Sequence, residues 1–167
     1  MNGQDPVTVC TSSLVVLKVF FLGVRGLQKA NHTDKTRLHC SALVDTLPAS
    51  EVLTRVRPGG GDRAKWDEEV NVHGFDSGDR ITFRLWGANA DGSCEDVLGE
   101  AHIESQGLLE SGFDGELPLC CNGQAGPIYL SVMIVPMDMS PHTMDSEGNV
   151  QDGGQPAVHV SVTGISI

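Results

Sequence analysis

Residues 14–27, LVVLKVFFLGVRGL, are the stretch that decides the fold class of this chain. Inside it the apolar residues Leu17, Val19 and Phe21 are separated from one another by single residues. Successive side chains of a β-strand point to opposite faces of the sheet, so a period of two places these three on one face. The stretch therefore predicts a β-strand that buries one face in a core.

Seven further stretches with the character of strands follow at short intervals. They are residues 38–44, 52–57, 66–72, 81–85, 97–103, 115–119 and 128–134. Turn-forming residues fill the gaps between them, and only 103–111 has room for a helical turn. This spacing predicts an all-β sandwich or barrel of eight strands.

The length of 167 residues corresponds to one domain with a short remainder. We expect an N-terminal tail at 1–13, the domain at 14–136, a flexible linker at 137–156 and an extra strand at 157–167. Residues 158–165 repeat the apolar and glycine pattern of residues 17–24. Two interpretations stay open, because this strand either begins a second, tandem unit or docks on the first domain as an edge strand.

The net charge of −11 is unevenly distributed along the chain. All 11 Lys and Arg residues lie between Lys18 and Arg84, whereas residues 85–167 carry only acidic charges. A sequence pI near 4.7 argues against a nucleic-acid-binding protein, which needs a basic face to displace counterions from phosphates. An anionic lipid headgroup would have to bind the first half of the chain.

The sequence contains neither a transmembrane segment nor the pattern of a signal peptide. No apolar run approaches the roughly 18 residues of a membrane span, because Lys18 interrupts the richest one. The residues before that run hold no Lys or Arg, which a signal peptide would carry. We therefore expect a cytoplasmic protein, either free or attached peripherally to a membrane.

Motifs for catalysis or structural metal binding are missing from the sequence. The five cysteines are odd in number and lack a C-x-x-C pair, so we expect reduced thiols rather than disulfides or a zinc site. The glycines at 59–61 are not followed by the Gly-Lys-Ser/Thr of a phosphate-binding loop, and no Gly-x-Ser-x-Gly is present. The sequence does not indicate an enzyme.

Taken together, the strands and turns resemble the C2 domain family of calcium- and phospholipid-binding β-sandwiches. The matching elements are the opening strand at 17–27, KWDEEV at 65–70, DRITFRLW at 79–86, DVLGE at 96–100, GELPL at 115–119 and GPIYLSV at 126–132. The resemblance covers about residues 14–135 and implies an eight-stranded antiparallel Greek-key β-sandwich. The order of the strands resembles the circularly permuted type II topology, and Trp66 is expected to be a packing group.

The resemblance also indicates where calcium would bind and which ligands have been lost. The two aspartates of the first loop fall on Asn31 and Arg37, and those of the third loop fall on Gly87, Asn89 and Asp96. A guanidinium at a ligand position repels a divalent ion. We therefore expect no cofactor and no dependence on calcium.

A weak calcium site is the alternative, if shifts within the loops bring other carboxylates into place. Asp34 would then serve in the first loop, and Asp91 or Glu95 in the third. The candidate ligands of this degenerate site are Asn31, Asp34, Asn89, Asp91 and Asp96.

A candidate anionic-lipid face completes the expectations. Arg55 and Arg57 alternate on the third expected strand, so both should point to one face, and Arg63 and Lys65 enter the fourth. The alternative is a solvated face neutralised by the nearby acidic residues. Two functions follow for a non-enzymatic module, namely peripheral attachment to anionic membrane lipid, or interaction with a protein partner without lipid binding.

Overall fold

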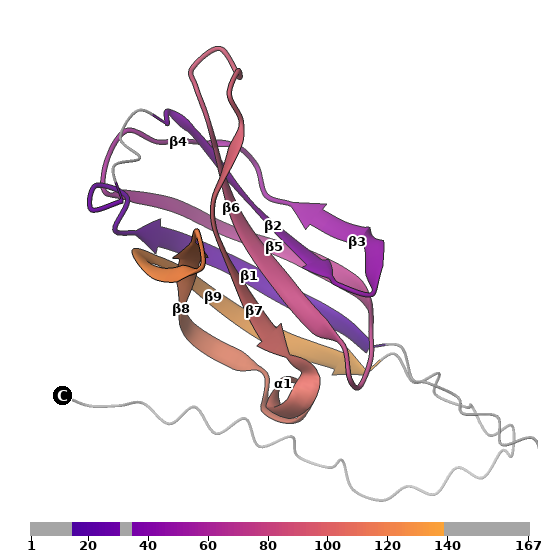
Figure 1. The fold of residues 1–167 in the computed structure, drawn as a ribbon. Helices are drawn as coiled ribbons and strands as arrows, with labels where there is room; N and C mark the ends of the chain where they lie inside the picture. The colour runs from indigo at the N-terminus through magenta and orange to yellow at the C-terminus, as the bar shows by residue number, and fades with distance from the viewer. Residues whose placement is uncertain (1–14, 31–34, 139–167) are drawn as a thin grey trace, which may run out of the picture.

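The computed structural model describes residues 15–30 and 35–138 (Figure 1). Within these residues there are nine strands and one short helix. The strands are β1 (Val15–Arg25), β2 (Arg37–Val44), β3 (Leu47–Leu53), β4 (Arg57–Pro58), β5 (Arg63–Phe75), β6 (Arg80–Ala88), β7 (Asp96–Glu104), β8 (Phe113–Cys121) and β9 (Gln124–Asp138). The helix α1 (Ser105–Ser111) lies between β7 and β8. No helix in this part of the chain is long and apolar enough to cross a membrane.

The strands form two antiparallel halves that face each other. One half has the order β3-β2-β6-β7 and the other the order β8-β9-β1-β5. A single bridge between Glu100 and Cys120 joins β7 to β8, so the halves are nearly separate sheets. The first strand, β1, lies between β5 and the last described strand, β9. The all-β sandwich is confirmed, and the ninth strand is the two-residue β4, which pairs with β2.

The core lies between the two halves and contains the residues that the alternation predicted. Leu17, Val19 and Phe21 on β1 are fully buried. Phe21 meets Phe83 of β6 edge to face, with ring centroids 6.0 Å apart. Burying one such side chain stabilises the fold by roughly 1.5–3 kcal/mol. Trp66 is also buried, as expected of a packing group.

The third expected strand was wrong in its position. The strand begins at Leu47 and ends at Leu53, instead of spanning 52–57. Pro48 obscures it in the sequence, although an edge strand tolerates proline. After Thr54 the pairing with β2 is interrupted until β4, and there the Arg55 amide donates to the Glu68 carboxylate of β5 at 3.1 and 3.2 Å.

The last described strand is longer than expected. β9 continues to Asp138, and Pro136 and Met137 pair with Leu17 and Val16 of β1. The start of the expected linker is therefore part of the sheet. The tail at 1–13, the remainder of the linker from 139 to 156 and the extra strand at 157–167 lie outside the described residues.

Candidate functional site

The end of the sandwich where calcium ligands were expected contains a buried lysine. Lys35 precedes β2, and its ammonium donates to Asp96 Oδ2 at 2.9 Å and to the Cys94 carbonyl at 3.0 Å. Lys35 is only 8% exposed. These contacts tie the segment before β2 to the loop that leads into β7. We call this group of Lys35, Cys94 and Asp96 the loop end.

Other expected ligands in the third loop are bonded within that loop. Asp91 Oδ1 accepts hydrogen bonds from the Ser93 hydroxyl at 2.6 Å and the Ser93 amide at 2.9 Å, and these bonds lower the pKa of Asp91. The Asn89 side-chain amide donates to the Ser93 hydroxyl at 3.4 Å. Asn31 and Asp34 lie outside the described residues. In the part of the chain that is described, no three His, Cys, Asp or Glu side chains gather as a metal site would require.

The ligand atoms that the loop end offers do not match those that calcium requires. Calcium requires six to eight oxygen ligands, with several carboxylates among them. The Asp96 carboxylate is instead neutralised by an ammonium, and Arg37 is exposed nearby, where it lines a small pocket with Gly92 and Glu95. Asp96 is 63% exposed, but its Oδ2 is held by the Lys35 ammonium, whose positive charge repels a divalent ion.

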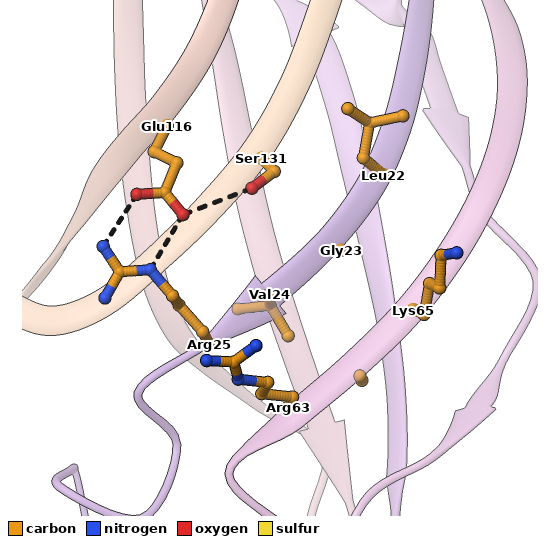
Figure 2. Close-up of a pocket in the computed structure, with 9 residues that line it drawn as sticks. Leu22, Gly23, Val24, Arg25, Arg63, Lys65, Glu116 and Ser131 are labelled. Atoms are coloured by element: carbon orange, nitrogen blue, oxygen red, sulfur yellow. Dashed lines mark hydrogen bonds and ion pairs between the residues drawn. The ribbon is translucent and has the colours of Figure 1, made fainter. Parts of the chain in front are cut away.

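A hollow on the outer face of the β8-β9-β1-β5 half is the second candidate site. Strand register aligns Lys65, Gly23, Ser131 and Glu116 in one row across the four strands. Because Gly23 has no side chain, the row is open at its centre, and a pocket of about 490 Å³ lies there (Figure 2). A Cβ at Gly23 would lie 2.8 Å from the Ala64 carbonyl oxygen, so the close approach of β5 requires glycine.

We call this pocket the Gly23 hollow. The side chains around it that matter for its chemistry are Leu22, Arg25, Arg63, Lys65, Glu116 and Ser131. They come from β1, β5, β8 and β9, and Figure 2 shows them around the bare backbone of Gly23. The hollow therefore depends on four strands rather than on one loop.

Arg25 and Glu116 form a two-pronged ion pair at one side of the hollow. Arg25 Nε and Nη2 donate to the two oxygens of Glu116 at 2.8 and 2.7 Å, and the Ser131 hydroxyl donates to the same carboxylate at 3.4 Å. The guanidinium also lies over the Tyr129 ring, 4.2 Å from its centroid. The bond from Arg25 lowers the pKa of Glu116 and the bond to Glu116 raises the pKa of Arg25, so both stay charged.

Arg63 and Lys65 supply the remaining positive charge. They alternate on β5 and are both exposed beside the hollow. Lys65 pairs with Asp67 at 2.9 Å, an exposed contact of the kind that contributes little to stability. The Arg63 side chain makes no hydrogen bond or ion pair within residues 15–30 and 35–138, and its charge contributes to lowering the pKa of Glu116.

The other two residues of the expected lipid face lie elsewhere. Arg55 follows β3 in a connection, and its carbonyl accepts the indole N–H of Trp66 at 2.9 Å. Arg57 is half-buried in β4, and its Nη2 donates to the Trp66 carbonyl at 3.3 Å. Neither residue lines the Gly23 hollow. Because Arg55 lies in a connection and Arg57 in β4, the expectation that they alternate on one strand was wrong.

Sequence reasoning missed Arg25, Lys35, Ser131 and Glu116 as members of these sites. The alternation along β1 does place Arg25 on the face opposite to the buried Val24. No local pattern, however, tells which strand lies beside β1. Strand β9 lies between β1 and β8, so Glu116 of β8 contacts Arg25 across an intervening strand.

Comparison with known proteins identifies the fold. No protein-family model and no curated protein matches the sequence. Human GIVD cytosolic phospholipase A2 matches with a TM-score of 0.61 at 14% identity, over 77% of this chain and 18% of that chain. A C2 domain-containing protein matches with a TM-score of 0.59 at 17% identity, over 77% of this chain and 92% of that one.

A C2 domain of plant extended synaptotagmin 1 is similar as well. Its TM-score is 0.57 at 14% identity, over 75% of this chain and 95% of that one. This chain thus spans less than a fifth of the phospholipase but matches nearly the whole of the isolated C2 domains. At such identities the likeness concerns the fold alone, and the described part of this chain has the fold of a C2 domain.

Proposed function

We propose that this chain is a non-enzymatic C2-like module that attaches to anionic membrane surfaces on the cytoplasmic side without calcium. The observation that carries the proposal is the Lys35 ammonium bonded to Asp96, at the end where the C2 resemblance assigns calcium. Lys35 provides a fixed positive charge in place of an ion. The positive charges that attract an anionic membrane are then those of Lys and Arg side chains, without a bound calcium ion.

The cationic residues that serve this attachment lie on and before β5. They are Arg55, Arg57, Arg63 and Lys65. Arg25 of β1 joins them, because it lines the Gly23 hollow together with Arg63 and Lys65. A basic residue near an anionic surface contributes about 1 kcal/mol, and the attraction decays within a Debye length of about 8–10 Å. Because of this short range, a local basic surface can bind a membrane although the net charge of the chain is −11.

Vesicle sedimentation tests the proposal directly. Vesicles of phosphatidylcholine alone and vesicles with added anionic lipid are each mixed with the protein, once in calcium and once in chelator. We expect binding to the anionic vesicles only, equal with and without calcium, and weaker at high salt. Binding that requires calcium, or equal binding to neutral vesicles, would show that the proposal is wrong.

A second function, protein interaction, is favoured by the edge strand β3. Among the described strands β3 pairs only with β2, and it exposes Leu47 by 42% and Leu53 by 58%. Unpaired backbone groups on an edge can accept another strand. Lack of binding to any vesicle, together with self-association that Leu53→Lys abolishes, would favour this function over the first.

A further inference from the structure

We infer that the Gly23 hollow binds the phosphate of a lipid headgroup, held by Arg63 and Lys65 with Arg25 beside them. This inference rests on the proposed attachment to anionic membranes and assigns it to one site. It also separates that site from Arg55 and Arg57, which do not line the hollow.

The register brings the three cations to one side of the sheet. Arg63 lies opposite Arg25 in the β1–β5 ladder, and Lys65 lies opposite Gly23. Arg63 and Lys65 are two positions apart on β5, which places their Cα atoms about 6–7 Å apart on the same face. The bare backbone at Gly23 leaves the space between them open, and a phosphate in that space can accept hydrogen bonds from both side chains.

The charges around the hollow favour an anion. Three cations and one carboxylate are among its lining residues, in a chain whose acidic residues outnumber basic ones two to one. The carboxylate of Glu116 is already engaged by Arg25 and Ser131. Glu116 therefore holds Arg25 in place at the edge of the hollow, while Arg63 is exposed and Lys65 is exposed in a solvent-screened pair with Asp67, which a phosphate can replace.

Apolar side chains on the same face favour a lipid as the source of the phosphate. Leu22 lines the hollow and is 38% exposed. Farther along the same face, Phe20 lies opposite Met133 in the β1–β9 ladder, and Val135 is 41% exposed. A basic pocket beside exposed apolar groups suits the boundary between headgroups and acyl chains, where a soluble phosphate would leave Leu22 in water.

Two double variants with equal charge test the site. Arg63→Ala/Lys65→Ala and Arg55→Ala/Arg57→Ala each remove two positive charges and change the net charge from −11 to −13. Binding is measured on phosphatidylcholine vesicles that contain phosphatidylinositol monophosphate, after melting curves have shown that both variants fold. We expect Arg63→Ala/Lys65→Ala to weaken binding roughly 25-fold, at about five-fold per charge, and the matched variant to weaken it by no more than about three-fold.

The outcomes separate this inference from the proposed function. If the unaltered protein binds no anionic vesicle, the proposed function fails. If it binds but the two double variants lose affinity equally, or Arg55→Ala/Arg57→Ala loses more, the function stands and the assignment to the Gly23 hollow is overturned.

Glu116→Gln gives a test that a folding defect cannot mimic. The amide oxygen can still accept a hydrogen bond from Arg25, but the only negative charge in the lining is removed. We expect binding to the same vesicles to tighten about five-fold. Unchanged or weaker binding by a folded Glu116→Gln protein would count against the site.

Leu22→Ser and a soluble headgroup distinguish the lipid from free phosphate. We expect Leu22→Ser to weaken vesicle binding several-fold and to leave the affinity for inositol bisphosphate unchanged. If inositol bisphosphate binds as tightly as the vesicles and Leu22→Ser has no effect on either, the lipid source is wrong.

Discussion

The loop end and the Gly23 hollow both set a cation against a carboxylate, but the two pairs serve different ends. At the loop end the cation, Lys35, is nearly buried and is bonded to Asp96 and to a carbonyl. In the hollow the paired residues, Arg25 and Glu116, are both about 40% exposed, and the Arg63 side chain beside them has no ion-pair partner among the described residues. A buried, bonded cation contributes to the stability of the fold, whereas an exposed cation remains accessible to a ligand.

The largest expected effect comes from removing the buried cation. Lys35→Ala deletes the hydrogen bonds to Asp96 and to the Cys94 carbonyl and the packing of the aliphatic stem, which should lower the free energy of unfolding by about 2 kcal/mol. Urea denaturation measures the change. Lys29→Ala, an exposed lysine in the same connection, is the matched control and should be nearly neutral. Equal losses of unfolding free energy in both variants would show that the buried lysine stabilises the fold no more than the exposed one.

Salt should separate the two ion pairs. The Debye length falls from about 10 Å at 0.1 M to about 3 Å at 1 M, so exposed charges are screened and buried ones much less. We expect the destabilisation caused by Arg25→Ala to shrink at 1 M salt, and that caused by Lys35→Ala to persist. Melting temperatures at both salt concentrations give the answer, and a parallel response of the two variants would be the contrary result.

The pH dependence sharpens the description of the Glu116 pair. The hydrogen bond from Arg25 holds the pKa of Glu116 below its usual value. The stabilisation is therefore fully present above the unfolded pKa of about 4.3 and is lost as pH falls through the lower, folded pKa. The difference in melting temperature between the unaltered protein and Glu116→Gln should be constant near neutral pH and shrink below about pH 4. A difference that stays constant down to pH 3 would contradict this.

Calcium should have the smallest effect, because the Asp96 carboxylate is already paired with the Lys35 ammonium, which repels a second cation. A ligand that binds only the native state adds RT ln(1 + [L]/Kd), about 2.7 kcal/mol at a hundred times Kd. We expect millimolar calcium to leave the melting temperature unchanged. A clear rise that Asp96→Asn abolishes would show that calcium displaces the lysine.

Several features of this protein could be predicted from local sequence. The alternation of Leu17, Val19 and Phe21 determined a strand with one buried face, and the structure buries all three. The spacing of motifs from 17 to 132 indicated the C2 fold, and the carry-over of ligand positions indicated that carboxylates were missing from the calcium loops. The predictions of the strand and of the fold are confirmed, because periodicity and residue type act within a few residues of the chain, whereas the loss of calcium ligands stays a prediction.

The third strand marks where local reasoning failed. Residues 52–57 were expected to form one strand, yet β3 ends at Leu53. Arg55 is bonded to Glu68 and Trp66 of β5, which interrupts the pairing with β2 until β4 resumes it. Those partners lie more than ten residues ahead, so nothing within the expected strand could reveal the interruption.

Both candidate sites were decided by the tertiary structure. Lys35 meets Asp96 across 61 residues, and Arg25 meets Glu116 across 91. The period of a strand says which face a residue occupies, whereas the neighbours on that face follow from the pairing and register of distant strands. The sequence therefore determined a β-sandwich with few calcium carboxylates and its basic residues in the first half. Only the folded arrangement of β5, β1, β9 and β8 decided which of those basic residues line the Gly23 hollow. The physical reason is that strand pairing depends on core contacts between residues far apart in the sequence.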